Sequence, residues 1–204
     1  MASWKYSGYS IRRRFYTNYC MGYESDTSWH WLLELKLRRT IGNNFQSFFS
    51  DVMEARYGEN FVRIKPYGKL GDSGCDGYLQ SDGSVYACYG AQNDAAGSAA
   101  GIISKMKDDF AKVLEKLPDI MNSWHMTHNI VEGLPIEALA LKKSFEEKHC
   151  EVSFHFFGRP KFVEILDALT EDQRITFLGA YARNSDYIEL SPVRSYLTEL
   201  VVNK

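Results

Sequence analysis

The sequence predicts an α/β fold in which helices cover both faces of a mixed central sheet. Three observations lead to this prediction. Short strand-like runs cluster between two helical patterns, and strand and helix patterns alternate in the second half of the chain. Hydrophobic residues make up 45% of the 204 residues, which is enough for a sizeable core. The expected order of elements is αβββαβαβαα, with an αβββαβ core.

The chain is expected to begin with helices. One spans about Trp29 to Arg39, and a second begins near residue 44 and stops at Gly58. The second carries apolar residues at helical spacing, namely Phe45, Phe48, Phe49, Val52 and Met53. Asn43 is followed three positions later by Gln46, a spacing typical of a variant capping box.

Three short strands are expected next, at 61–65, 75–79 and 84–89. The first alternates apolar and basic residues. The turn Ser81-Asp82-Gly83 joins the other two. Together these runs predict a three-stranded antiparallel meander.

The rest of the chain begins with a long helix and then alternates. An apolar stripe runs from Ala99 to Leu117, and Pro118 ends it. The elements expected afterwards are a strand at 124–131, a helix at 136–148, a strand at 151–157, a helical stripe at 162–169, a short helix capped by Thr170 and Gln173 and closed by Gly179, and a final helix from Ser191-Pro192. This alternation favours a sheet covered on both faces.

Composition and charge divide the chain into three parts. We expect a basic aromatic arm and helix at 1–42, the α/β core at 43–180 and a C-terminal helical extension at 181–204. Residues 1–40 hold seven Lys or Arg and three acidic residues, a net charge of +4, although the whole chain carries −2. Arg12, Arg13 and Arg14, interleaved with aromatic residues, would suit a phosphate backbone and stacked bases. Packing of the arm onto its own or a neighbouring domain is the other interpretation.

Several protein classes are disfavoured. Apolar runs end well short of the ~20 residues that a bilayer span needs, and the N-terminus lacks the apolar core of a secretory signal. The cysteines show no C-x-x-C pair, which argues against a zinc cluster and favours reduced thiols. We therefore expect a cytoplasmic protein without membrane contact, and a homo-oligomer is possible.

The segment 68–78 holds the densest signal for chemistry. Four glycines accompany Asp72 and Asp76, so the backbone can bend sharply and expose carboxylates at the start of a strand. Oxygen ligands of this kind suit magnesium. The spacing fits neither an EF-hand nor a phosphate-binding P-loop. A glycine-rich turn whose aspartates bond their own backbone is the alternative interpretation.

At this segment the sequence resembles a known family. Gly71-Asp72-x-x-x-Asp76-Gly77, a turn and Val85-Tyr86-Ala87-Cys88-Tyr89-Gly90 resemble the core of the PD-(D/E)XK, or restriction-endonuclease-like, nucleases. The likeness is greatest to domains fused to bacterial antiphage defence proteins, including NTPase-type immune sensors. It extends over about 43–180, through Phe45-Gln46, Lys105 to Phe110, Thr127-His128-Asn129 to Gly133-Leu134-Pro135 and Phe177-Leu178-Gly179. The resemblance implies a metal-dependent DNA endonuclease, using Mg²⁺ or Mn²⁺, within a larger defence complex.

The resemblance also implies a role for each matching residue. Asp76 corresponds to the aspartate that binds the metal, and Gln46 to a position where the first helix often offers a glutamate. Ala87 stands at the second ligand position and Tyr89 at the lysine position, two apart and so on one strand face. Gln92, shortly after the third strand, is a further candidate.

Two of these positions depart from the family. Alanine coordinates nothing, and a phenol with a pKa of about 10 is a poor substitute for an ammonium. Lys69, which would also suit a phosphate backbone, and Lys105 are candidate replacements for the lysine. The departures, whether Ala87 is natural or introduced, support the alternative of a catalytically degenerate module serving nucleic-acid binding or protein assembly. His128 is interpreted as a core histidine bonded to backbone, with a general base as the other interpretation.

Overall fold

The computed structural model describes residues 23–65, 74–92 and 95–179. The chain divides into a compact unit, His30–Gly179, and a second unit made of Met1–Trp29 and Ala180–Lys204. The predicted arm with Arg12, Arg13 and Arg14, the loop with Lys69 and the predicted final helix all lie outside the described residues. The compact unit contains the whole sheet.

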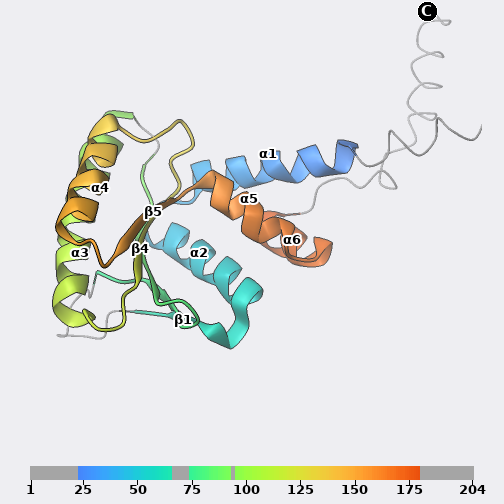
Figure 1. Ribbon diagram of the computed structural model, residues 1–204. Coiled ribbons are helices and arrows are strands. Elements are labelled where there is room, and N and C mark those ends of the chain that lie inside the picture. Colours follow the sequence, from blue (N-terminus) through green and yellow to red (C-terminus); the bar gives the residue numbers. More distant parts are fainter. Residues whose placement is uncertain (1–22, 66–73, 93–94, 180–204) are drawn as a thin grey trace, which may run out of the picture. The chain divides into compact units, whose positions relative to one another are not determined.

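The sheet has five strands in the order β1-β2-β3-β4-β5 (Figure 1). Their bounds are β1 Phe61–Arg63, β2 Gly77–Leu79, β3 Ser84–Tyr89, β4 Ser123–His128 and β5 Ser153–Phe157. The pairs β1–β2 and β2–β3 are antiparallel, whereas β3–β4 and β4–β5 are parallel. The predicted meander and the mixed sheet are confirmed. β4 ends three residues before the predicted Val131, because Asn129 turns its side chain to the backbone of Ala91.

Helices cover both faces of the sheet, as predicted for an α/β fold (Figure 1). Their bounds are α1 Tyr23–Arg39, α2 Gly42–Tyr57, α3 Ala95–Lys116, α4 Ile136–Lys148, α5 Arg159–Asp167 and α6 Glu171–Leu178, with a short 3-10 turn at Gly58–Asn60. α3 and α4 lie on one face, and α2 and α5 lie on the other. The segment from α2 to β4 has the predicted αβββαβ order.

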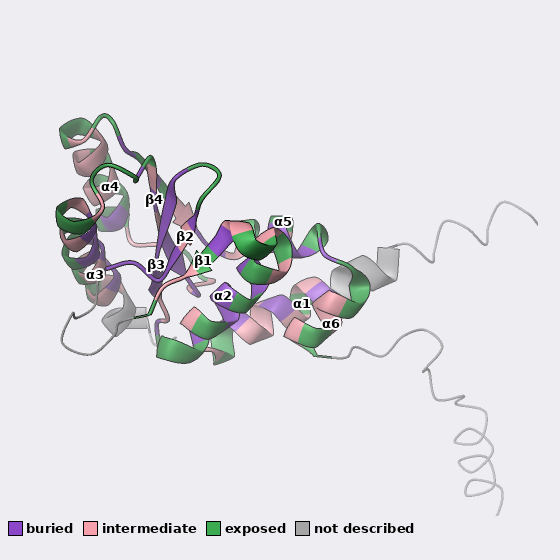
Figure 2. Cartoon of the chain, turned by 90° about the horizontal axis from the view of Figure 1, so that it is seen from below, coloured by how far each residue is buried: buried purple, intermediate pink, exposed green. Residues whose placement is uncertain are grey.

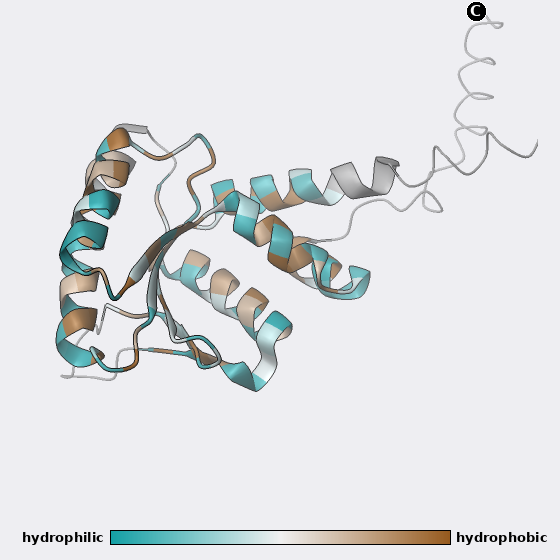
Figure 3. Cartoon of the chain, in the orientation of Figure 1, coloured by the Kyte–Doolittle hydropathy of each residue, from teal (hydrophilic) through white to brown (hydrophobic). Residues whose placement is uncertain are grey.

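The strand alternation builds a different core on each face. On the α3 face, Val85 and Ala87 of β3 pack with Ile102 and Met106, and all four are buried. Most of β3 is coloured as buried (Figure 2). Along α3 brown apolar segments alternate with teal polar ones, as expected for a helix with one apolar stripe (Figure 3). On the α2 face the core is aromatic, with the Phe49 ring 5.3 Å from the ring of Tyr86.

One of the two predicted helix caps is confirmed. Thr170 and Gln173 form a full capping box at the start of α6. The capping box predicted for Asn43 and Gln46 is wrong, because α2 begins two residues earlier and Ile41 occupies its N-cap position. The Gln46 side chain is directed elsewhere, as described below. Within the described ranges, the helices are too short or too polar to cross a bilayer.

Candidate functional site

Asp76 enters the sheet through an irregularity at the start of β2. Its N–H donates to the carbonyl of Tyr86 at 2.7 Å, although the register partner of Tyr86 is Gly77. Two successive residues, Asp76 and Gly77, therefore lie opposite Tyr86, which is the arrangement of a β-bulge. Cys75 packs into the core on the α3 face, while Asp76 reaches a residue of α2. The bulge thus turns the carboxylate of Asp76 toward the α2 face.

A glycine makes this approach possible. Gly74 has a φ of +69°, and a side chain there would collide with the backbone of Asp109. Only glycine tolerates both constraints without strain. At least one glycine of the predicted loop therefore serves chain packing rather than ligand binding.

The carboxylate of Asp76 is held inside the protein. The side chain is buried, with the residue 9% exposed. Oδ1 accepts a hydrogen bond from Gln46 Nε2 at 2.6 Å, and Oδ2 accepts one from the backbone N–H of Cys88 at 2.6 Å. Short hydrogen bonds to an ionised carboxylate are among the stronger polar contacts in proteins. The structure thus joins Gln46 to Asp76, and both carboxylate oxygens are used by the protein itself.

Contacts between Gly90 and the start of α2 place Gln46 beside Asp76. The N–H of Gly42 donates to the carbonyl of Gly90 at 2.9 Å, which fixes the start of α2 at the end of β3. Gly90 is packed so closely against Gly42 and Phe45 that a Cβ on it would lie 2.9 Å from the Phe45 side chain. Gln46, one turn into α2, therefore lies beside the bulge.

The other predicted site residues lie elsewhere. Ala87 is fully buried in the core on the α3 face. Tyr89 shares that face, as its spacing predicted, and a side chain at Gly101 of α3 would collide with its hydroxyl. Gln92 is exposed after β3. Ala87 and Tyr89 therefore point to the opposite face of the sheet from the Gln46–Asp76 pair.

Lys105, a candidate replacement for the missing lysine, is engaged with a buried acid. Its Nζ lies 2.6 Å from Oδ2 of Asp109, which is 2% exposed. Lys112 lies farther from the same carboxylate, at 3.7 Å. The positive charge of Lys105 slightly offsets the burial that raises the pKa of the Cys88 thiol well above its usual value. The charge of Lys105 thus acts on Cys88, the residue that bonds Asp76. The protonated Cys88 thiol is a poor nucleophile and a poor metal ligand.

The described residues do not fit the magnesium ion that the family resemblance implies. Oxygen ligands are what magnesium requires. Both carboxylate oxygens of Asp76 accept hydrogen bonds from the protein, and Gln46 directs its N–H group at Asp76. The side chain of Ala87 has no atom that can bind a metal ion. Within the described part of the chain, no three His, Cys, Asp or Glu side chains are placed to share a metal ion.

Asn129 is a structural anchor that the sequence patterns did not single out. It is fully buried, and its Oδ1 accepts from the N–H of Ala91 at 2.8 Å. Its Nδ2 lies within hydrogen-bond distance of three carbonyls, those of Leu37 at 3.1 Å, Thr40 at 2.7 Å and Ala91 at 3.0 Å. One side chain therefore joins the end of α1, the chain after β3 and the end of β4. An asparagine directly after a buried strand is the only signal the sequence offers for it.

His128 is a core residue, as one of the two sequence interpretations predicted. It is buried, and a Cβ on Gly158 would lie 2.7 Å from its Cε1. Burial lowers the pKa of His128 to about 4, and a hydrogen bond with the backbone of Ile130 partly offsets this. The ring is neutral at pH 7 and enclosed, so it is not placed as a general base.

Comparisons with family models, with curated proteins and with solved structures each gave no match.

Proposed function

We propose that the chain is a nuclease-like module that binds nucleic acid without cutting it. The αβββαβ order and the sequence resemblance support the nuclease-like architecture. The observation that carries the loss of catalysis is the enclosure of Asp76, whose two oxygens accept hydrogen bonds from Gln46 and Cys88.

The energetics favour this state over a metal-bound one. Hydrogen bonds to charged groups contribute about 1.5–3 kcal/mol each. A metal ion at Asp76 would have to share the carboxylate oxygens with these two donors, using their remaining lone pairs inside a residue that is 9% exposed. Ala87 cannot compensate, because it provides no ligand and faces the α3 core.

Basic residues support the binding part of the proposal. Lys36, Arg38 and Arg39 lie in the last turn of α1, and Arg39 is exposed. Arg38 is committed to Glu34 and Glu132. The exposed Arg39 therefore presents a positive charge of the kind that neutralises a phosphate. Such contacts position a duplex without reading its sequence.

The binding part is tested by fluorescence anisotropy with a labelled DNA duplex over a series of salt concentrations. The logarithm of affinity should fall linearly with the logarithm of salt, by about 0.9 per phosphate neutralised. Replacing Arg12, Arg13 and Arg14 by Ala should weaken binding and reduce the slope. The matched control replaces Lys143 and Lys148, two exposed lysines of α4, and should leave the slope unchanged. Equal effects of both variants, or no binding by the parent, would refute the proposal.

A metal-dependent DNA endonuclease of an antiphage defence complex is the second candidate, and the contact between Gln46 and Asp76 favours it. Two variants distinguish the candidates in a supercoiled-plasmid assay with Mg²⁺ or Mn²⁺. Ala87→Gln restores the residue type that the resemblance implies at the second ligand position, although that position faces the α3 core. Ala87→Met adds similar volume without a ligand atom, so both variants overpack the core alike. We expect no cutting by the parent or by either variant. Cutting by Ala87→Gln alone, or cutting by the parent that Asp76→Ala abolishes, would establish the endonuclease instead.

A further inference from the structure

Three rings form a column across the α2 face of the sheet, from the middle of β3 to the middle of β5. Tyr86, His125 and His155 are register partners on β3, β4 and β5. The ring centroids of Tyr86 and His125 are 4.7 Å apart, and those of His125 and His155 are 4.8 Å apart, each pair 26° from parallel. The row begins at Tyr86, two residues before Cys88, and runs from β3 away from Asp76 toward the edge strand β5.

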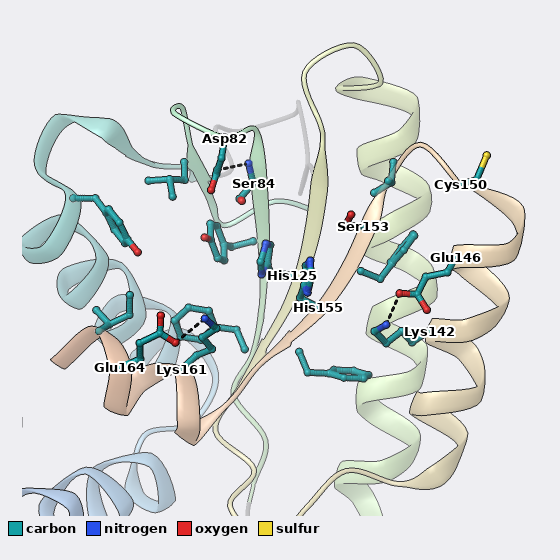
Figure 4. Close-up of a pocket in the computed structure, with 18 residues that line it drawn as sticks. Asp82, Ser84, His125, Lys142, Glu146, Cys150, Ser153, His155, Lys161 and Glu164 are labelled. Atoms are coloured by element: carbon teal, nitrogen blue, oxygen red, sulfur yellow. Dashed lines mark hydrogen bonds and ion pairs between the residues drawn. The ribbon is translucent and has the colours of Figure 1, made fainter. Parts of the chain in front are cut away.

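The two imidazoles open into a cavity of about 660 Å³. Figure 4 shows His125 and His155 side by side, with Lys161 and Glu164 of α5 on one side and Lys142 and Glu146 of α4 on the other. The volume is within the range of about 300–1,000 Å³ typical of small-ligand sites. The histidines are therefore accessible to a small solute.

Hydrogen bonds among serine side chains hold His125 in place. Its Nε2 lies 3.0 Å from Ser123 Oγ, which lies 2.9 Å from Ser84 Oγ. His155, in contrast, is exposed on the edge strand β5. One ring is thus anchored and the other is free to adjust to a ligand.

The charges around the cavity favour a cation over an anion. Among the described lining residues, Asp82, Glu146 and Glu164 outnumber Lys142 and Lys161. Lys161 is paired with Glu164 at 2.7 Å, and Lys142 is paired with Glu146. Burial, His155 and Lys161 lower the pKa of His125, and the negative charge of Asp82 opposes this shift.

We propose that His125 and His155 chelate a divalent transition-metal ion such as Zn²⁺, Ni²⁺ or Cu²⁺, with water completing its coordination. Imidazole nitrogen is a preferred ligand for these ions. With a metal–nitrogen distance of about 2.1 Å, the ion lies about 3.2 Å from each ring centre, so two rings on a tetrahedral ion are about 5 Å apart. The observed separation of 4.8 Å meets this requirement.

Binding requires only local adjustment. Stacked rings do not aim their nitrogens at one point, so each ring must turn about χ2, a broad and soft torsion for histidine. For His125 this turn gives up the hydrogen bond between Nε2 and Ser123 Oγ. The backbone positions are already suitable, because directly opposed residues on neighbouring strands have closely spaced Cβ atoms. Burial lowers the pKa of His155 and lowers that of His125 to about 4, so both rings are neutral at pH 7.

The test is calorimetric titration of the chain with Zn²⁺, together with electron paramagnetic resonance of the Cu²⁺ form. We expect one ion per chain at this site and a nitrogen hyperfine signature on copper. His155→Gln is exposed and should fold, and it should weaken binding about tenfold or more. His125→Gln should do the same, whereas His30→Gln, which does not line the cavity, should bind like the parent.

The result is independent of the proposed function, because Asp76→Ala should leave Zn²⁺ binding unchanged. Absence of binding by the parent would overturn the inference. So would His155→Gln binding Zn²⁺ as tightly as the parent, or a copper signature unchanged in that variant.

Discussion

Asp76 and His155 are polar residues on the same face of one sheet, but their surroundings are opposite. Asp76 lies where α2 begins, is 9% exposed and has both oxygens bonded by the protein. His155 lies on the edge strand and opens into a cavity of about 660 Å³. The acidic residue that resembles a catalytic one is thus enclosed, whereas the accessible polar side chains lie toward the edge strand β5. A matching residue type therefore does not by itself identify a working site.

The difference arises from how the helices cover this face. The start of α2 is fixed to Gly90, which brings Gln46 against the bulge. α5 packs near the end of β5 and leaves the first residues of the parallel strands open, so Ser153 and His155 are exposed. We call these regions the enclosed end, which contains Asp76, His128 and Asn129, and the open end, which contains His125 and His155. We expect the unfolding free energy to depend on the enclosed end and not on the open end.

The largest effect is expected for Asn129→Ala at the enclosed end. The variant removes the partner of four backbone groups, and leaving such buried groups unpaired should lower the unfolding free energy by about 3–5 kcal/mol. Urea denaturation measures this. Asn122→Ala, which removes one exposed hydrogen bond to Asp82, is the matched control and should cost less than about 1 kcal/mol. Similar costs for the two variants would contradict the anchor role.

His128 is expected to change the unfolding free energy with pH by nearly as much. Its pKa is lowered to about 4 in the folded state, so the unfolded chain binds more protons below pH 6.5. Stability from this residue is therefore complete above about pH 6.5 and is lost as the pH falls toward 4, by on the order of 3 kcal/mol. Urea denaturation at several pH values should show a shallower loss in His128→Gln than in the parent. Parallel curves for the two proteins would refute a buried neutral His128.

A smaller loss is expected for Asp76→Ala. Removing the carboxylate leaves the amides of Gln46 and Cys88 without their acceptor, which should cost about 2–3 kcal/mol. Asp119→Ala, an exposed acid, should cost less than about 0.5 kcal/mol. An Asp76→Ala variant as stable as the parent would show that the carboxylate has no structural role.

The smallest effect is expected at the open end. His155→Ala removes an exposed ring that stacks on His125, so its cost should be about 0.5 kcal/mol or less. Thermal unfolding without added metal measures it. A loss as large as that of Asp76→Ala would remove the contrast between the two ends.

The order and type of the elements could be predicted from the sequence because local periodicity determines them. The stripe of α3, the limits of β3 and the capping box at Thr170 all depend on residues close together in the chain. The bulge before Gly77 could not be predicted, because it depends on contacts with Tyr86 and Asp109, which are distant in sequence. This irregularity decides which face Asp76 reaches, and hence which predicted partners it meets.

The cavity histidines escaped sequence reasoning for a related reason. His125 and His155 are thirty residues apart, and they become neighbours only through the register of two parallel strands. Their spacing in the chain resembles no ligand motif. Asn129 is similar, since its four partner groups come from two segments distant in sequence, the end of α1 and the chain after β3.

The central claim is that Asp76 supports the structure and does not hold a metal ion. It is tested most directly by measuring the unfolding free energies of the parent and Asp76→Ala with and without magnesium. A ligand that binds the folded state must stabilise it. We expect Asp76→Ala to lose the same amount in both conditions. A parent that gains stability from magnesium, with that gain abolished in Asp76→Ala, would contradict the account.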